Sequence, residues 1–218
     1  MAMEGRAGMK YLFIDASENS TFAQTGNAAG FRSQVFATDR NFAARITNIC
    51  DEMLQNADMT FADLDLLAVC TGPGSLTGLR VAAAFLRTAA MLANKPLVGI
   101  SIFDWSLQTL IEKNISGQVR LVMPTLIDKA FSINADLPDL NHSQPELIER
   151  TTAGAQPDTY GIRFSYPGVT SLQPEPAALH NLINLKRHSP ARSLPEILNV
   201  LPLYVIPSQA ERKFKEAS

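Results

Sequence analysis

The sequence predicts an α/β fold in which helices cover a mixed sheet. An apolar run at residues 11–14 ends in Asp15, as expected of a strand that is buried on both faces. Two shorter strand-like segments follow, and helical patterns then alternate with apolar strands up to residue 124. Three strands followed by alternating helices and strands are typical of a layered α/β domain.

The elements of the first half follow in a regular order. Residues 20–38 read as two short strands joined by a turn near Gly26 and Asn27. Residues 39–56 have apolar side chains at helical spacing and predict an amphipathic helix of about five turns. The remaining elements are a strand at 64–70, a helix at 79–95, a strand at 96–101, a helix at 102–114 and a strand at 118–124.

The composition of the chain changes after Pro124, where prolines become frequent and long runs of regularly spaced apolar residues become rare. We therefore divide the chain into a first lobe at 9–113 and a smaller, partly β second lobe with a charged tail at 114–218. Residues 1–8 precede the first strand and are expected to be a leader or an alternative start. No sequence repeat is visible.

Composition excludes several classes of protein. With 218 residues, 46% of them hydrophobic, the chain can fill a core. A formal net charge of -2 gives no overall field that would attract RNA or an anionic membrane, so any RNA contact has to be local or made through a partner. Cys50 and Cys70 form no C-x-x-C motif, and no apolar run approaches the ~20 residues that span a bilayer, so a cytoplasmic location is expected.

The segment CTGPGSLTGLR carries three glycines between a strand and a helix. Unpaired N–H groups at the start of a helix can bind phosphate. A Walker A loop, however, needs Lys and Ser/Thr after its last glycine, whereas Leu79 and Arg80 follow Gly78 here. We expect Gly72, Gly74 and Gly78 to provide positive φ angles or a close approach of the backbone.

Ser75 and Thr77 in this segment admit two interpretations. As a nucleophile Ser75 would need a base, but the G-x-S-x-G elbow is absent and no motif marks any of the three histidines as that base. The simpler interpretation is that Ser75 or Thr77 caps the following helix, which stabilises it by about 1 kcal/mol. Without H-E-x-x-H or an i, i+4 histidine pair, no metal site is expected.

Asp15 and Ser17 are the candidate ligand-binding residues of a cleft. Asp15 comes directly after the first strand, where a fold of this layout presents side chains to a cleft. One interpretation is that it faces Mg²⁺ or phosphate. The other is that it forms a hydrogen-bonded turn with Ser17, which we favour because no second carboxylate can be placed beside it from the sequence.

One stripe of the helix after the loop is a candidate docking surface. Small side chains at steps of three and four residues allow another helix to approach closely. The alternative is that alanine is present as a strong helix former and that the arginines are solvated. The stripe comprises Arg80, Ala83, Ala84, Arg87 and Met91. The opposite face is expected to contact the sheet through Leu79, Ala82, Phe85, Leu86, Ala89 and Leu92.

Several of these segments resemble one known family. GPGSLTGLR at 72–80 is similar to the G-P-G-S-F-T-G-L-R signature of the bacterial TsaB (YeaZ) family, a non-catalytic subunit of the machinery that makes threonylcarbamoyladenosine next to the anticodon of tRNA. FIDAS at 13–17 resembles its opening I-D-T-S, and PLVGIS at 96–101 resembles its next strand. The resemblance covers residues 10–113 and is poor beyond them. The matched loop residues are Gly72, Pro73, Gly74, Ser75, Thr77 and Gly78.

The resemblance implies an actin-like, Hsp70-like ATPase (RNase H-like) fold of two lobes without catalytic residues of its own. It implies pairing with a TsaD-type catalytic subunit through the helices of the first lobe, a TsaE-type ATPase as a further partner, and homodimers through the same surface. tRNA would be reached through the complex, which would also use the ATP and Mg. Two alternatives stay open: a small ATP-dependent kinase of the same superfamily, using Asp15 and the 72–78 loop, and a peptidase using Ser75.

Overall fold

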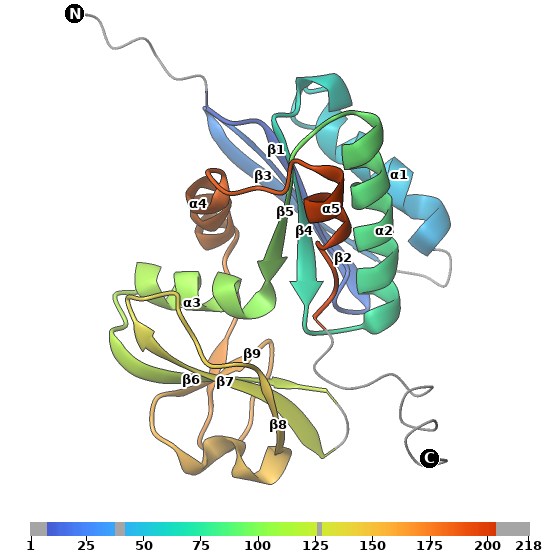
Figure 1. Ribbon diagram of the computed structural model, residues 1–218. Coiled ribbons are helices and arrows are strands. Elements are labelled where there is room, and N and C mark those ends of the chain that lie inside the picture. The colour runs from blue at the N-terminus through green and yellow to red at the C-terminus, as the bar shows by residue number, and fades with distance from the viewer. Residues whose placement is uncertain (1–7, 38–41, 126–127, 204–218) are drawn as a thin grey trace, which may run out of the picture.

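The computed structural model describes residues 8–37, 42–125 and 128–203, which form two lobes, each built on a five-stranded sheet (Figure 1). In the first sheet β1, β2 and β3 are antiparallel neighbours, whereas β4 runs parallel to β1 and β5 parallel to β4. The strands are β1 (Tyr11–Asp15), β2 (Ser20–Asn27), β3 (Gly30–Ala37), β4 (Leu66–Gly72) and β5 (Leu97–Ser101), in the spatial order β3-β2-β1-β4-β5.

The second sheet repeats this topology. Its strands are β6 (Gly117–Pro124), β7 (Lys129–Leu137), β8 (Glu146–Glu149), β9 (Thr159–Ile162) and β10 (Thr170–Leu172). The spatial order β10-β9-β6-β7-β8 again combines an antiparallel run of three strands with two parallel strands. Two mixed sheets of the same connectivity, covered by helices, confirm the predicted actin-like, RNase H-like α/β class.

Helices cover the two lobes unequally. In the first lobe α1 (Phe42–Gln55) and α2 (Leu76–Leu92) pack on the same face of the sheet. Between β8 and β9 the second lobe has only the short 3-10 helix η2 (Arg150–Ala155), and between β9 and β10 it has a loop. A further short 3-10 helix, η1 (Phe61–Asp63), precedes β4. The second lobe therefore lacks the two long helices that occupy these positions in the first.

The predicted elements are found with small shifts at their ends. The expected turn at Gly26 and Asn27 lies slightly later, because β2 continues to Asn27 and the Asn27 side chain accepts a hydrogen bond from the N–H of Ala29 (2.8 Å). Helix α2 begins at Leu76, before the predicted start at 79, so Gly78 lies inside its first turn. The first helix begins at Phe42, and residues 39–41 lie outside the described part of the chain.

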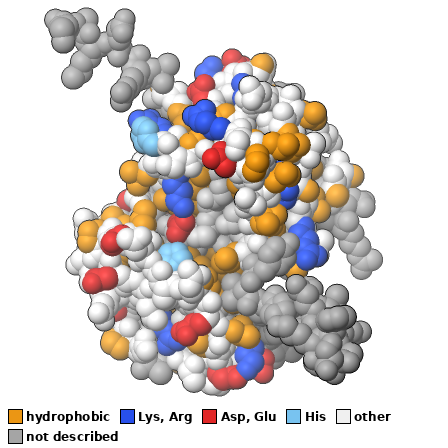
Figure 2. All heavy atoms as spheres, viewed as in Figure 1, with side chains coloured by type: hydrophobic (Ala, Val, Ile, Leu, Met, Phe, Trp, Pro, Cys, Tyr) orange, Lys and Arg blue, Asp and Glu red, His pale blue; other side chains and the backbone are white. Residues whose placement is uncertain are grey.

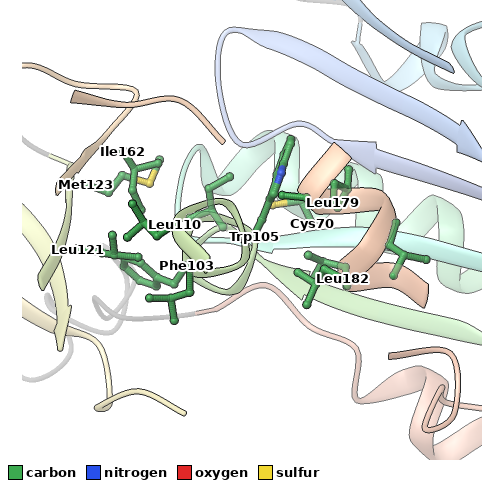
Figure 3. Close-up of a cluster of buried hydrophobic side chains, with 14 of the residues drawn as sticks. Cys70, Phe103, Trp105, Leu110, Leu121, Met123, Ile162, Leu179 and Leu182 are labelled. Carbon is green, nitrogen blue, oxygen red and sulfur yellow. The ribbon is translucent and has the colours of Figure 1, made fainter. Parts of the chain in front are cut away.

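One hydrophobic core runs through both lobes by way of α3 (Ile102–Glu112). Figure 3 shows Leu110 and Phe103 of α3 against Leu121 and Met123 of the second sheet. Trp105, on the same helix, points toward the first lobe, and its indole N–H donates to the carbonyl oxygen of Glu175 at 2.7 Å. Because α3 is buried between the sheets, the lobes are joined by packed apolar side chains.

After β10 the chain returns to the first lobe. Helix α4 (Pro176–Lys186) packs against α3, β3 and β5, and α5 (Leu194–Leu198) packs against α2. Between them Ala191 pairs with Leu97 of β5 through two backbone hydrogen bonds of 2.8 and 2.9 Å. Both helices therefore follow residue 113 in sequence but contact the first lobe.

Across the described residues no helix combines the length and the apolar character that a membrane crossing requires.

Candidate functional site

The loop at residues 72–78, called the signature loop below, packs directly onto the turn that follows β1. Gly72 and Gly74 have φ angles of +94° and +155°, which side chains rarely permit. A Cβ atom at Gly78 would overlap the carbonyl oxygen of Ala16, and one at Gly74 would overlap Ser17. These contacts confirm the predicted roles of the three glycines. They leave the loop no room for larger residues at these positions.

Ser75 occupies the N-cap position of α2, but its hydroxyl makes no capping hydrogen bond. Instead its backbone N–H donates to the carbonyl oxygen of Ser17 at 2.6 Å. The prediction that Ser75 or Thr77 caps the helix is therefore confirmed in position, because Ser75 is the N-cap residue, whereas the expected stabilising side-chain hydrogen bond is absent. Within the described part of the chain no base is hydrogen-bonded to the Ser75 hydroxyl.

Asp15 forms the predicted turn and an unpredicted ion pair. Its Oδ1 accepts a hydrogen bond from the N–H of Ser17 at 2.8 Å, which confirms the turn. Its Oδ2 accepts a hydrogen bond from Nη2 of Arg163 at 2.9 Å. The carboxylate is only 2% exposed, and Arg163 belongs to the second lobe. The ion pair therefore crosses between the lobes.

Arg163 follows β9 and reaches into the space between the lobes. Its Nη1 lies 3.2 Å from Oγ of Ser17 and 3.5 Å from Oε1 of Glu18. Its guanidinium carbon lies 5.6 Å from the centroid of the Trp105 ring, at cation–π distance. Burial alone would lower the pKa of Arg163, but the charges of Asp15 and Glu18 outweigh it and raise that pKa. The guanidinium is thus held as a cation with its charge already matched.

Arg163, Ser17 and Glu18 line a cavity of about 520 Å³ between the lobes. Gly74 and Ser75 of the glycine-rich loop also border this cavity, and Arg163 contributes to its wall from the second lobe. One guanidinium faces two carboxylates here, so the cavity offers no net positive charge to a phosphate group.

The exposed stripe of α2 differs in part from the prediction. Arg80 and Ala84 are exposed, Met91 is 44% exposed and Arg87 is half-buried. The assignment of Ala83 to the surface is wrong, because it is buried in the core cluster that α2 forms with α1, α5 and the first sheet. Leu92, expected to face the sheet, is 84% exposed because the helix ends there.

Among the described residues no three His, Cys, Asp or Glu side chains are grouped so that they can hold a metal ion.

The middle of the chain matches a known family by sequence. Residues 34–124 match the family model of TsaD, tRNA N6-adenosine threonylcarbamoyltransferase. Curated relatives with that name include proteins from Lawsonia intracellularis, 43% identical over 51 residues, and from Mus musculus, 39% identical over 64 residues. These matches cover 23% and 29% of this chain and 14% and 19% of the relatives. The chain thus spans about a fifth or less of the curated relatives that it matches.

Two solved structures resemble nearly the whole chain. A Pseudomonas aeruginosa protein, described as uncharacterized with similarity to peptidase YeaZ, superposes with a TM-score of 0.73 and 17% identity over 91% of this chain and 100% of its own. YeaZ from Pseudomonas aeruginosa gives a TM-score of 0.71 and 16% identity over 90% of this chain and 99% of its own. The chain therefore has the YeaZ fold along nine-tenths of its length, and its predicted resemblance to the TsaB (YeaZ) family is confirmed.

Proposed function

We propose that this chain is a non-catalytic scaffold and activator subunit of a complex that installs threonylcarbamoyladenosine next to the anticodon of tRNA. The observation that carries the proposal is a YeaZ fold in which Arg163, on the wall of the interlobe cavity, is already ion-paired with Asp15 of the same chain. The match of residues 34–124 to a tRNA threonylcarbamoyltransferase family supports a role in the same modification. The proposed partners are a TsaD-type catalytic subunit and a TsaE-type ATPase.

The paired carboxylate of Asp15 supports a subunit that performs no nucleotide chemistry itself. Both oxygens of Asp15 have partners within this chain, one in Ser17 and one in Arg163. A Mg²⁺ ion at Asp15 would have to break a buried ion pair, which costs several kcal/mol. In this proposal ATP and Mg are therefore used by the other subunits of the complex. The kinase alternative requires Mg-ATP to bind the isolated chain.

The outer faces of α1 and α2 are the proposed surface for the catalytic subunit, and for a second copy of this chain when it is alone. Arg80, Ala84 and Met91 expose a narrow stripe on α2. The neighbouring α1 exposes Ala43 and Ala44, which also permit a close approach. A partner that buries these faces in only one of its conformations would be shifted toward that conformation. Activation then needs no catalytic group from this chain.

The test is threonylcarbamoylation of tRNA by the TsaD-type and TsaE-type proteins of the same organism, with and without this chain. The reaction is supplied with threonylcarbamoyl-adenylate and ATP. We expect modification to require this chain, and we expect calorimetry to detect no Mg-ATP binding by the chain alone. Modification that proceeds equally well without the chain would contradict the proposed function.

Ala84→Glu tests the proposed surface. A long side chain at an exposed small residue of α2 is expected to abolish co-purification with the catalytic subunit, because it prevents the close approach of a partner helix that alanine permits. The free energy of unfolding of the isolated variant is expected to lie within about 0.5 kcal/mol of the wild-type value, since the site is exposed. Ala29→Glu, in the exposed β2–β3 turn, is the matched control. Normal co-purification of Ala84→Glu would exclude this surface.

A further inference from the structure

A cavity of about 590 Å³ lies at the amino ends of β1, β4 and β5, on the edge of the first sheet opposite the signature loop. Met9, Leu66 and Pro96, each at the start of one of these strands, give it an apolar wall. The connection between α4 and α5 gives it a basic wall. This volume is within the range of small-molecule and nucleotide pockets.

The basic wall consists of Arg187, His188 and Arg192. Figure 2 shows basic and histidine side chains gathered at this end of the first lobe, around the α4–α5 connection. The sequence here, KRHSPAR, has four basic residues and no acidic one. The first of them, Lys186, is used elsewhere, because its Nζ lies 2.6 Å from Oδ2 of Asp104.

The backbone of this wall is fixed at several points. Arg187 is the C-cap residue of α4. Ala191 is hydrogen-bonded to Leu97 at the edge of the sheet, and Arg192 follows it directly. The N–H of Arg192 donates to Oε2 of Glu196 at 2.9 Å. Both arginines therefore project from positions that the fold determines.

Neither guanidinium has an acidic partner in the described part of the chain, where no carboxylate lies within 4.0 Å of Arg187 or Arg192. Arg163 and Arg120, by contrast, are both ion-paired. The one acidic residue of the cavity, Asp65, accepts a hydrogen bond from the backbone N–H of Lys10 at 2.8 Å. Two cations thus face an apolar wall with their charge unmatched.

We propose that this cavity binds the phosphate backbone of the tRNA on which the proposed complex acts, an inference that rests on that proposed function. Guanidinium groups bind phosphate through paired N–H donors, and an apolar wall accommodates the ribose or base beside it. Because the chain has a formal net charge of -2, any contact with RNA has to come from such a local cluster. The cavity would add RNA affinity without taking part in the reaction.

The double variant Arg187→Gln/Arg192→Gln tests the site in the full assembly. Binding of fluorescently labelled tRNA is measured by anisotropy over a series of KCl concentrations. We expect the double variant to bind tRNA about tenfold more weakly than the wild type. We also expect the slope of log affinity against log salt concentration to decrease in magnitude by about one for each lost phosphate contact. The control variant Arg32→Gln/Lys113→Gln removes the same charge from distant elements and is expected to leave affinity and slope near those of the wild type.

The outcomes separate this inference from the proposed function. If the double variant binds tRNA with wild-type affinity and slope while modification still requires the chain, the inference is overturned and the function stands. If modification does not require the chain, the proposed function fails. The inference is then tested on the isolated chain, by comparing the affinity of the wild type, the double variant and the control variant for labelled tRNA. Displacement of tRNA from the isolated chain by AMP at equal phosphate concentration would identify a free nucleotide as the ligand and overturn the RNA assignment.

Discussion

Arg163 places one positive charge between the lobes, where it lies close to the carboxylates of Asp15 and Glu18. Its contact with Asp15 spans 148 residues, so no local pattern in the sequence indicates it. The turn between Asp15 and Ser17, two residues apart, was predictable because such turns depend on neighbouring side chains only. The same contrast applies in the signature loop. The positive φ angles and close backbone contacts of the glycines were predictable from the sequence. The hydrogen bond from the backbone N–H of Ser75 to the carbonyl oxygen of Ser17 was not, because it joins two loops that are far apart in the chain.

Replacing Arg163 with methionine leaves the carboxylate of Asp15 buried without its cation. We expect a loss of about 3 kcal/mol in the free energy of unfolding, measured by urea denaturation, because a single charge left in a buried pair is costly. The second change Asp15→Asn removes that charge and is expected to restore part of the loss. If Arg163→Met and the double variant are equally destabilised, the ion pair is not the cause.

At the scale of elements, helix patterns were read correctly where one face meets the sheet over several turns. In α1 the buried residues Phe42, Ile46, Ile49 and Met53 recur at the expected spacing. The strands of the second lobe were harder to place, since β8, β9 and β10 have only four, four and three residues. Segments this short contain too few residues to display a period.

A charged cluster joins three elements at the rim between the lobes. Oδ1 of Asp104 on α3 lies 3.2 Å from Nε2 of His142, in the segment after β7, and Lys186 on α4 contacts the other oxygen. The hydrogen bond to Asp104 raises the pKa of His142. Burial alone would raise the pKa of Asp104, but its bonds to His142 and Lys186 outweigh burial and lower that pKa.

Stability is therefore expected to depend on pH through His142. Because its pKa is higher in the folded state, its contribution is complete below the ordinary histidine pKa of about 6.5 and is lost as pH rises through the raised value. Asp104 acts in the opposite direction, and its contribution is lost only as pH falls through its lowered pKa. The loss should be about 0.5–1 kcal/mol between about pH 6 and pH 9.

The measurement is urea denaturation at these two pH values, with His142→Gln as the comparison. The variant is expected to lose the part of the pH dependence that comes from the imidazolium. His188→Gln is a suitable control because His188 lies outside the cluster. A pH dependence that is the same in His142→Gln and the wild type would exclude the cluster as its source.

At the scale of the whole molecule, the two sheets repeat one topology without a visible repeat in sequence. The repeat was not predictable, because the second lobe has replaced two long helices with η2 and a loop. The shared core through α3 was equally hidden, because Phe103 and Trp105 are both buried but contact different lobes, and their spacing does not indicate which lobe each one meets. The division into two lobes was indicated by the change in composition after Pro124, whereas the actin-like, RNase H-like class came from the family resemblance.

The shared core predicts that the lobes unfold together. Leu110→Ala removes a side chain that is 1% exposed and lies between them, so we expect a loss of about 2–4 kcal/mol. Calorimetry should still show one transition, and the fluorescence of Trp105, the only tryptophan, should follow it. Leu185→Ala, at a residue that is 59% exposed, is the control. Two separated transitions would contradict the shared core.

The return of the chain to its first lobe also determines when that lobe is finished during synthesis. Ala191 pairs with Leu97 at the edge of β5, and α5 (Leu194–Leu198) packs against α2. A ribosome adds roughly 5–20 residues per second, so the first sheet exists for several seconds before its last contacts can form. Over that interval the nascent first lobe exposes the apolar surface that α4 and α5 later cover. Chaperone dependence is thus expected to be greatest late in translation, after the second lobe has already emerged.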